Sequence, residues 1–375
     1  MSFVAEFAKI PRDKLLLDLY SCTALDVERA LVSPAGDLRS LLALLSPAAE
    51  PYIETMAQRS AALTRQRFGA NLGMYLPLYV SNLCANDCDY CGFSMSNKLK
   101  RKTLNEQELM AEMAIIKDRG FDSVLLVSGE HETKVGIDYF KQMLPLVKQQ
   151  FSHVAMEVQP MSEDHYRQLV ALGLDAVMIY QETYQPETYA RHHSRGKKMD
   201  FAYRLATPDR VAAAGVDKIG LGVLLGLDDW RLDALMMGYH LDYLERRYWR
   251  TRFSISLPRL RPCTGGITPK VMLSDLGLVQ MICAFRLFNQ QLDISMSTRE
   301  SPELRDNILP LGITQISAGS STQPGGYQAP DSQLDQFEIS DDRSVEQVIK
   351  QMQLQGFNPV FKDWEANWIT KWNRQ

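Results

Sequence analysis

From Met74 onward, short apolar runs rich in β-forming residues alternate with amphipathic helical patterns. Each run is a nearly continuous apolar block, which is typical of a parallel strand buried on both faces. The helical patterns between the runs carry boundary signals, such as an N-cap residue at Asn105 and a terminal glycine at Gly120. The predicted strands are residues 74–81, 123–129, 153–159, 175–181, 218–225, 252–258, 292–298 and 313–319.

This alternation predicts an α/β protein with a closed (β/α)8 TIM-type barrel over residues 73–319, and an open doubly wound sheet is the alternative. Residues 1–72 have apolar positions at helical spacing and predict an N-terminal helical extension. Residues 320–375 are expected to form a C-terminal loop and helical tail that close the barrel. Within them, residues 320–343 are rich in Gly, Ser, Gln, Pro and Asp, so we expect a loop folded over the pocket, with disorder as the alternative. Three tryptophans of the tail share one predicted helical face: Trp364, Trp368 and Trp372.

Composition narrows the classes of function. Of the 375 residues, 45% are hydrophobic and 23% are charged, which is ordinary for a globular protein, and the net charge of -4 does not favour nucleic acid as a partner. The apolar runs are too short to span a bilayer, and charged residues near the N-terminus precede any long apolar run. We therefore expect a cytoplasmic protein without a membrane anchor. In that reducing compartment, closely spaced cysteines are more often metal ligands or catalytic thiols than disulfides.

Three of the six cysteines lie in the loop after the first predicted strand, spaced C-x3-C-x2-C: Cys84, Cys88 and Cys91. Thiolates suit zinc, an iron–sulfur cluster or copper. No second ligand pair at zinc-site spacing follows, and the other three cysteines are expected to pack as small hydrophobic residues. A cluster held by three cysteines would leave one iron open, which is typical of catalytic rather than structural metal sites. A zinc-stabilised binding module without catalytic activity is the alternative.

The spacing C-x3-C-x-aromatic-C in the first loop of an α/β barrel resembles the radical S-adenosylmethionine (SAM) superfamily. Phrases at later strand ends resemble its tyrosine lyases, and within them the 2-iminoacetate synthases of thiamine thiazole biosynthesis. These phrases are VSGE, YQETY, IGLGVLLGL, SLPRLRP and the run from STRE to QPGGY. The tyrosine lyase of hydrogenase maturation has a further C-terminal cysteine cluster, whereas this chain has no cysteine after Cys283.

The resemblance implies a lyase that cleaves the Cα–Cβ bond of L-tyrosine to 2-iminoacetate (dehydroglycine) and p-cresol. It implies one 4Fe-4S cluster held by three cysteines, and SAM as the cofactor that is cleaved to 5′-deoxyadenosine and methionine. A flavodoxin or ferredoxin would supply the electron, and a thiazole synthase subunit would consume the imine. A tryptophan lyase, or another radical SAM carbon–carbon lyase, is the alternative within enzymes.

By the same resemblance, the three clustered cysteines would ligate the 4Fe-4S cluster, and Tyr90 between them would lie against the adenine of SAM. Gly129 and Glu130 stand where the superfamily often has a Gly-Gly-Glu run near the SAM amino group, with Ser128 in place of the first glycine.

Three further polar residues have the chemistry that SAM requires: Glu157, Glu182 and Arg204. The two carboxylates lie at the ends of predicted strands and suit the ammonium, sulfonium and ribose groups of SAM. The guanidinium of Arg204, early in the following helix, suits the carboxylate of SAM. Structural ion pairs are the competing role for each of the three.

The amino-acid substrate also presents a carboxylate, so a second arginine is expected in the pocket. Arg299, after the seventh predicted strand, is the candidate, and Arg259 and Arg261 are its rivals. Serines at and after the end of the eighth predicted strand are expected to add hydroxyl and N–H donors: Ser317 with Ser320 or Ser321.

Overall fold

The structure, a computed structural model, describes residues 2–362. Its barrel strands are β1 (Asn71–Ser81), β3 (Ser123–Ser128), β4 (His153–Glu157), β5 (Ala176–Glu182), β7 (Lys218–Val223), β8 (Arg252–Ser256), β9 (Asp293–Met296) and β10 (Gln315–Ser317). Neighbouring strands in this sheet are parallel, and β1 also pairs with β10, so the sheet closes on itself. The eight predicted strands and the closed (β/α)8 barrel are therefore confirmed.

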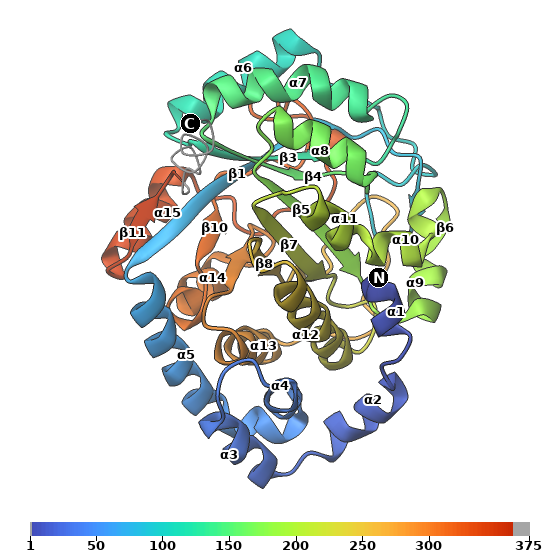
Figure 1. Cartoon of the computed structure of the whole chain (residues 1–375). Coiled ribbons are helices and arrows are strands. Elements are labelled where there is room, and N and C mark those ends of the chain that lie inside the picture. The colour runs from blue at the N-terminus through green and yellow to red at the C-terminus, as the bar shows by residue number, and fades with distance from the viewer. Residues whose placement is uncertain (1, 363–375) are drawn as a thin grey trace, which may run out of the picture.

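Helices surround the barrel (Figure 1). In the first of them the predicted cap is present: the Asn105 side chain accepts a hydrogen bond from the Glu108 backbone N–H at 3.0 Å, and the Glu108 side chain accepts one from the Asn105 N–H. The helices are α6 (Glu106–Asp118), α7 (Ile137–Gln150), α8 (Glu163–Ala171), α9 (Pro186–His192), α10 (Phe201–Leu205), α11 (Thr207–Ala213), α12 (Trp230–Arg247), α13 (Asp275–Phe288), α14 (Pro302–Ile308) and α15 (Val345–Leu354), with short 3-10 turns η2 (Lys197–Met199), η3 (Leu309–Leu311) and η4 (Ser332–Leu334).

The residues before the barrel are helical, as predicted: α1 (Phe3–Phe7), α2 (Arg12–Ser21), α3 (Ala24–Val32), α4 (Leu38–Leu45), η1 (Pro47–Tyr52) and α5 (Ile53–Phe68). Helix α4 packs its buried residues Leu41, Leu44 and Leu45 against α12 and α13, and one hydrophobic core runs through these helices and the barrel. The division of the chain at residues 72 and 319 stays a prediction. Trp364, Trp368 and Trp372 lie outside the described residues.

Three short strands have no counterpart in the sequence prediction. β2 (Asp87–Cys88) pairs antiparallel with β6 (His193–Arg195), and β11 (Asn358–Val360) adds to the outer side of β1 in parallel. Strands of two or three residues are too short to show a two-residue period, so pattern reasoning does not detect them. The β2–β6 pair matters for function because Cys88 belongs to it.

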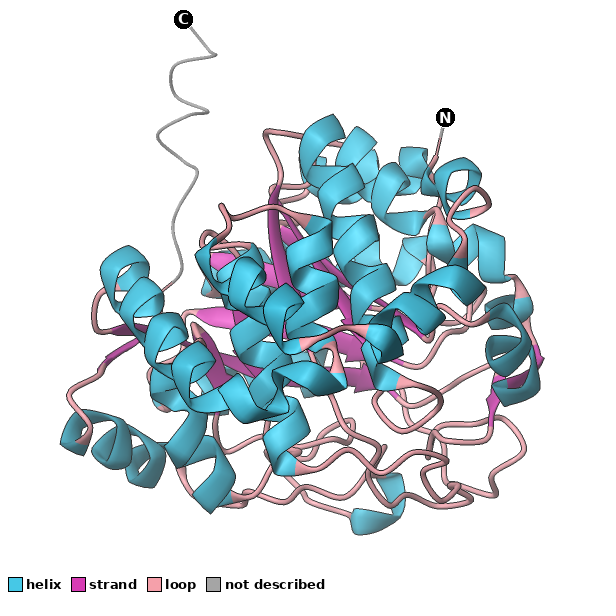
Figure 2. Ribbon diagram, turned by 90° about the horizontal axis from the view of Figure 1, so that it is seen from below, coloured by secondary structure: helices cyan, strands magenta, loops and turns pink. Residues whose placement is uncertain are grey.

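The long loops gather on one side of the molecule, with helices over the other (Figure 2). In a parallel barrel, the loops that follow the strands share one end of the barrel, and chemistry is built from those loops. Within residues 2–362, no helix combines the length and apolar character needed to cross a membrane.

Candidate active site

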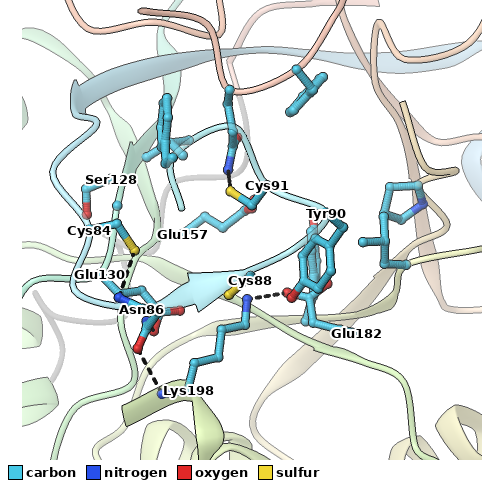
Figure 3. Close-up of a pocket in the computed structure, with 18 of the residues that line it drawn as sticks. Cys84, Asn86, Cys88, Tyr90, Cys91, Ser128, Glu130, Glu157, Glu182 and Lys198 are labelled. Carbon is cyan, nitrogen blue, oxygen red and sulfur yellow. Dashed lines mark hydrogen bonds and ion pairs between the residues drawn. The ribbon is translucent and has the colours of Figure 1, made fainter. Parts of the chain in front are cut away.

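The three clustered cysteines line one pocket: Cys84, Cys88 and Cys91 (Figure 3). Contacts with distant segments hold their loop against the barrel. Cys88 pairs with His193 across the β2–β6 ladder, and the Ala85 N–H donates to the Glu130 carbonyl at 2.8 Å. The loop is thus fixed by segments more than 40 residues away in sequence.

The environment of the sulfurs fits an iron–sulfur cluster. Cys84 Sγ accepts a hydrogen bond from the Asn86 N–H at 3.4 Å, and Cys91 Sγ accepts one from the Gln336 side-chain amide at 3.6 Å. Such N–H donors support the thiolate ligands of clusters. Burial raises the pKa of Cys84 to about 11, so this thiol keeps its proton until a metal displaces it. Within residues 2–362, no three His, Cys, Asp or Glu side chains are arranged to hold a single metal ion such as zinc.

Tyr90 lies at the wall of the pocket, and a neutral histidine holds its phenol. His193 Nδ1 lies 2.6 Å from the Tyr189 carbonyl oxygen, which only accepts, so Nδ1 carries the proton. His193 Nε2 therefore accepts from the Tyr90 hydroxyl at 2.6 Å. Burial and the charge of Lys198 lower the pKa of His193 to about 2, which keeps the imidazole neutral. The Tyr90 ring is thereby fixed toward the pocket.

Four largely buried charged side chains form a paired network beside the cysteines, and Figure 3 labels three of them: Glu130, Glu182 and Lys198. Arg204 lies 2.9 Å from Glu130 and 3.6 Å from Glu182, and Lys198 lies 2.7 Å from Glu182. Although burial opposes ionisation, the two cations hold the pKa of both carboxyls below its usual value. Arg204 Nε also donates to the Tyr180 carbonyl at 2.6 Å. The protein itself thus pairs Glu130, Glu182 and Arg204, and their contacts with SAM stay predictions.

Glu182 adopts a strained backbone conformation at this network. Its φ of 69° makes it the one non-glycine residue of the described range in the left-handed region. The pairing of β5 with β7 shifts register between Tyr180 and Glu182. This conformation costs about 1 to 2 kcal/mol, and the two ion pairs of the Glu182 carboxylate offset that cost. The shift turns the carboxylate toward Lys198 and the pocket.

Gly129 allows the loop after β3 to pack against the cysteine loop. A Cβ atom at this position would lie 2.4 Å from the Leu83 carbonyl oxygen, so no side chain fits there. The Gly129 N–H donates to the Ser81 carbonyl at 2.9 Å. Gly129 and Ser128 both line the pocket, and the buried Ser128 hydroxyl has no hydrogen-bond partner among the described residues.

Glu157, at the end of β4, lines the same pocket. In the part of the chain that the structure describes, no hydrogen-bond donor or counterion contacts its carboxyl group. Burial raises the pKa of Glu157 to about 7, although the charge of Arg299 opposes the shift. Glu157 is therefore a pocket carboxyl that changes its protonation near neutral pH.

Replacing Glu157 with glutamine is expected to stabilise the cofactor-free protein at pH 8 and to have little effect at pH 5. The folded-state pKa of about 7 exceeds the reference value of 4.5, so the native state binds more protons between these values and stability falls as pH rises. At pH 8 the ionised Glu157 lowers the free energy of unfolding of the parent protein by at most about 3 kcal/mol. Urea unfolding at both pH values measures this loss, with Glu303→Gln, at an exposed position of α14, as the control. If Glu157→Gln changed the free energy of unfolding equally at pH 5 and pH 8, the raised pKa of Glu157 would be contradicted.

The structure separates the three candidate substrate arginines. Arg259 pairs with the buried carboxylate of Glu300, with Nε 2.9 Å from Oε2, so its charge is neutralised. Arg261 and Arg299 line the pocket. The Arg299 guanidinium lies over the Phe337 ring, 3.5 Å from its centroid, and pairs with no carboxylate among the described residues. Arg299 Nη1 also donates to the Arg259 carbonyl at 3.4 Å, whereas its Nε and Nη2 groups have no partner among the described residues.

The three serines expected beside Arg299 do not line this pocket: Ser317, Ser320 and Ser321. Their hydroxyls are buried and have no hydrogen-bond partner in the described part of the chain. The Ser317 carbonyl accepts a hydrogen bond from the buried Arg305 guanidinium. Residues 320–343 have a defined path, and two of them, Gln336 and Phe337, line the pocket as a loop folded over it would.

Sequence reasoning missed Asn86, Lys198, Gln336 and Phe337 as pocket residues. The sequence around Lys198, RGKKMD, is indistinguishable from an exposed charged loop. Asn86 is a polar residue inside the cysteine motif, so its position could have indicated that it lines the pocket. Gln336 and Phe337 lie in a segment without periodicity, so nothing local marks them.

Comparisons with known proteins agree with this architecture. The radical SAM superfamily profile matches residues 78–237, and that of the Biotin and Thiamin Synthesis associated domain matches residues 256–358. The chain is 53% identical over 366 residues to a 2-iminoacetate synthase of Escherichia coli strain K12, covering 97% of each chain. It is 51% identical over 369 residues to that of Salmonella typhimurium strain LT2, covering 98% of each.

Among solved structures, the FeFe-hydrogenase maturase HydG from Carboxydothermus hydrogenoformans matches with a TM-score of 0.83 at 27% identity, covering 96% of this chain and 82% of that one. Membership of the radical SAM superfamily implies a 4Fe-4S cluster and SAM. The sequence is more than half identical to these two synthases along nearly its whole length. The chain therefore belongs to the 2-iminoacetate synthase family of radical SAM enzymes.

Proposed function

We propose that this protein is a tyrosine lyase, which cleaves the Cα–Cβ bond of L-tyrosine to 2-iminoacetate and p-cresol. One observation carries the proposal: the three clustered cysteines line the same pocket as Arg299, whose guanidinium pairs with no carboxylate among the described residues. A cluster site and a carboxylate site are therefore close enough to act on one substrate. The near full-length similarity to 2-iminoacetate synthases supports the choice of reaction.

Cys84, Cys88 and Cys91 would hold the 4Fe-4S cluster and leave one iron for SAM. When bound and reduced, the cluster supplies the electron that cleaves SAM to methionine and a 5′-deoxyadenosyl radical. The protein orients SAM and excludes water. Tyr90 would contact the adenine, with its ring fixed by His193.

The remaining proposed SAM contacts come from the loop after β3, the ends of β4 and β5, and α10: Gly129, Glu130, Glu157, Glu182 and Arg204. Glu130 and Glu182 are held as carboxylates by Lys198 and Arg204, which gives this wall fixed charges before any ligand arrives. Preorganised charge of this kind costs no reorganisation when the cofactor binds.

Arg299 would bind the tyrosine carboxylate through two parallel N–H donors. Contact with the Phe337 ring and the hydrogen bond from Nη1 to the Arg259 carbonyl hold the guanidinium, and its Nε and Nη2 donors are left for such a pair. We retain Ser317, Ser320 and Ser321 as further donors, because their unpartnered hydroxyls would gain an acceptor from a carboxylate that reached the loop after β10.

The product and the electron requirement define the partners that we propose. A flavodoxin or ferredoxin would reduce the cluster, and a thiazole synthase subunit would consume the unstable imine. The match to the Biotin and Thiamin Synthesis associated domain supports this pathway. All six cysteines are free, which fits the reducing cytoplasm.

Anaerobically reconstituted protein, mixed with SAM, dithionite and L-tyrosine, is expected to form p-cresol and 5′-deoxyadenosine. The same reaction with L-tryptophan should give no cleavage product of the indole side chain. Chromatography of both reactions measures this difference. Cleavage of tryptophan without p-cresol from tyrosine would overturn the substrate, and reconstituted protein without iron and sulfide would overturn the whole proposal.

A further inference from the structure

Residues 335–338, which we name the pocket strap, lie against the cysteine loop although they belong to the C-terminal part of the chain. The Gly92 N–H donates to the Gln336 carbonyl at 3.0 Å, and the Gln336 N–H donates to the Thr322 carbonyl at 3.1 Å. The Glu338 N–H donates to the Pro262 carbonyl at 3.0 Å. The strap is thus tied to the loops after β1, β8 and β10, and these ties determine its position.

The side chain of Gln336 points at the cysteine motif. Its Nε2 lies 3.6 Å from Cys91 Sγ, and its Oε1 accepts a hydrogen bond from the buried Tyr79 hydroxyl at 2.7 Å. Because a thiolate only accepts hydrogen bonds, the amide N–H₂ group must face the sulfur and the amide oxygen must face Tyr79. Both ends of the amide therefore have a partner.

Gly92, directly after Cys91, allows this approach. A Cβ atom there would lie 2.4 Å from the Gln336 carbonyl oxygen, so any larger residue would push the strap away from the thiol. The backbone of the cysteine motif and the strap are thus fitted to one another at the residue next to the sulfur.

We propose that Gln336 is a positioning residue that donates a hydrogen bond to the Cys91 thiolate and raises the reduction potential of the cluster. An N–H dipole directed at a ligand sulfur stabilises the reduced cluster more than the oxidised one, because the reduced cluster carries one more negative charge. The inference rests on the proposed ligation of the cluster by Cys91.

Gln336 is the donor that substitution can test. The hydrogen bond to Cys84 comes from the backbone of Asn86 and survives any side-chain change, whereas the one to Cys91 comes from a side chain. The neighbouring strap residue, Phe337, contacts Arg299 instead. Adjacent residues of one strap therefore serve the cluster and the substrate arginine separately.

The experiment is a redox titration of the reconstituted full-length protein, monitored by electron paramagnetic resonance without substrate. Gln336→Leu is expected to lower the ratio of reduced to oxidised cluster about threefold at a fixed potential, which is a shift of about 30 mV at about 59 mV per tenfold. Gln336→Glu keeps the length of the side chain but presents a carboxylate, so its potential should fall at least as far. Iron and sulfide are counted in each variant.

Two matched variants distinguish a hydrogen bond from a loosened strap. Gln333→Leu makes the same change at an exposed position nearby, and Phe337→Leu alters the strap on its Arg299 side. Both should titrate like the parent protein. An unchanged midpoint in Gln336→Leu and Gln336→Glu, or an equal shift in Phe337→Leu, would overturn the inference and leave the proposed function standing. A parent protein without any cluster would overturn the proposed function itself.

Discussion

Replacing Cys88 with alanine is expected to remove the bound iron and to lower p-cresol formation by more than about 10⁴-fold. Cys88 is buried in β2, and two remaining thiolates leave the cluster without a third ligand. Alanine keeps the backbone pairing with His193, so the loop itself should persist. Iron and sulfide content, the visible spectrum and the p-cresol yield measure the loss.

Cys263→Ala is the matched control for this change. The Cys263 thiol lies beside the cysteine motif and donates to the Tyr90 carbonyl at 3.3 Å, yet it is not part of the proposed ligand set. The variant should retain the iron of the parent protein and most of its activity. Equal iron loss in Cys263→Ala, or full iron retention in Cys88→Ala, would show that the ligands are assigned wrongly.

Replacing Arg299 with glutamine is expected to raise the KM for tyrosine about 100-fold, because the neutral amide cannot form a charge-assisted, two-donor pair with the carboxylate. A hydrogen bond to a charged group contributes about 1.5 to 3 kcal/mol, and about 1.4 kcal/mol corresponds to a factor of ten. The planar amide can still stack on Phe337, so the pocket wall should remain. Initial rates of p-cresol formation over a range of tyrosine concentrations measure the change.

Two readouts separate this effect from damage to the cluster. The iron content and the SAM-dependent change in the paramagnetic resonance spectrum should be those of the parent protein. Arg261→Gln tests the rival arginine, which also lines the pocket. A larger rise in KM for Arg261→Gln than for Arg299→Gln would transfer the carboxylate site to Arg261.

Much of the fold was predictable because its signals are local. The strands are continuous apolar runs, and the β-propensity of a run such as SVLLVSG is a property of a few adjacent residues. The cap at Asn105 and the spacing of the three cysteines are likewise read within a few positions. These signals survive in the sequence because neighbours along the chain remain neighbours in space.

The chemistry of the pocket was predictable only in part. Glu157 and Glu182 were predicted at strand ends, Arg204 early in a helix and Arg299 after a strand, and the structure places all four on one pocket. Which of these charges were already paired was not predictable. Lys198, in a turn without regular pattern, proved to be a partner of Glu182, and no property of its own segment indicates a buried charge.

By itself, the sequence determined a barrel of parallel strands and three thiols in its first long loop, since both depend on spacing along the chain. The tertiary structure decided which groups face one another. Closure of the barrel brings Gln336 to Cys91 across 245 residues and engages Arg259 with Glu300, whereas Arg299 pairs with no carboxylate among the described residues. Contacts of this kind leave no periodic trace, because each contributes only about 1 kcal/mol net and depends on the relative placement of distant loops.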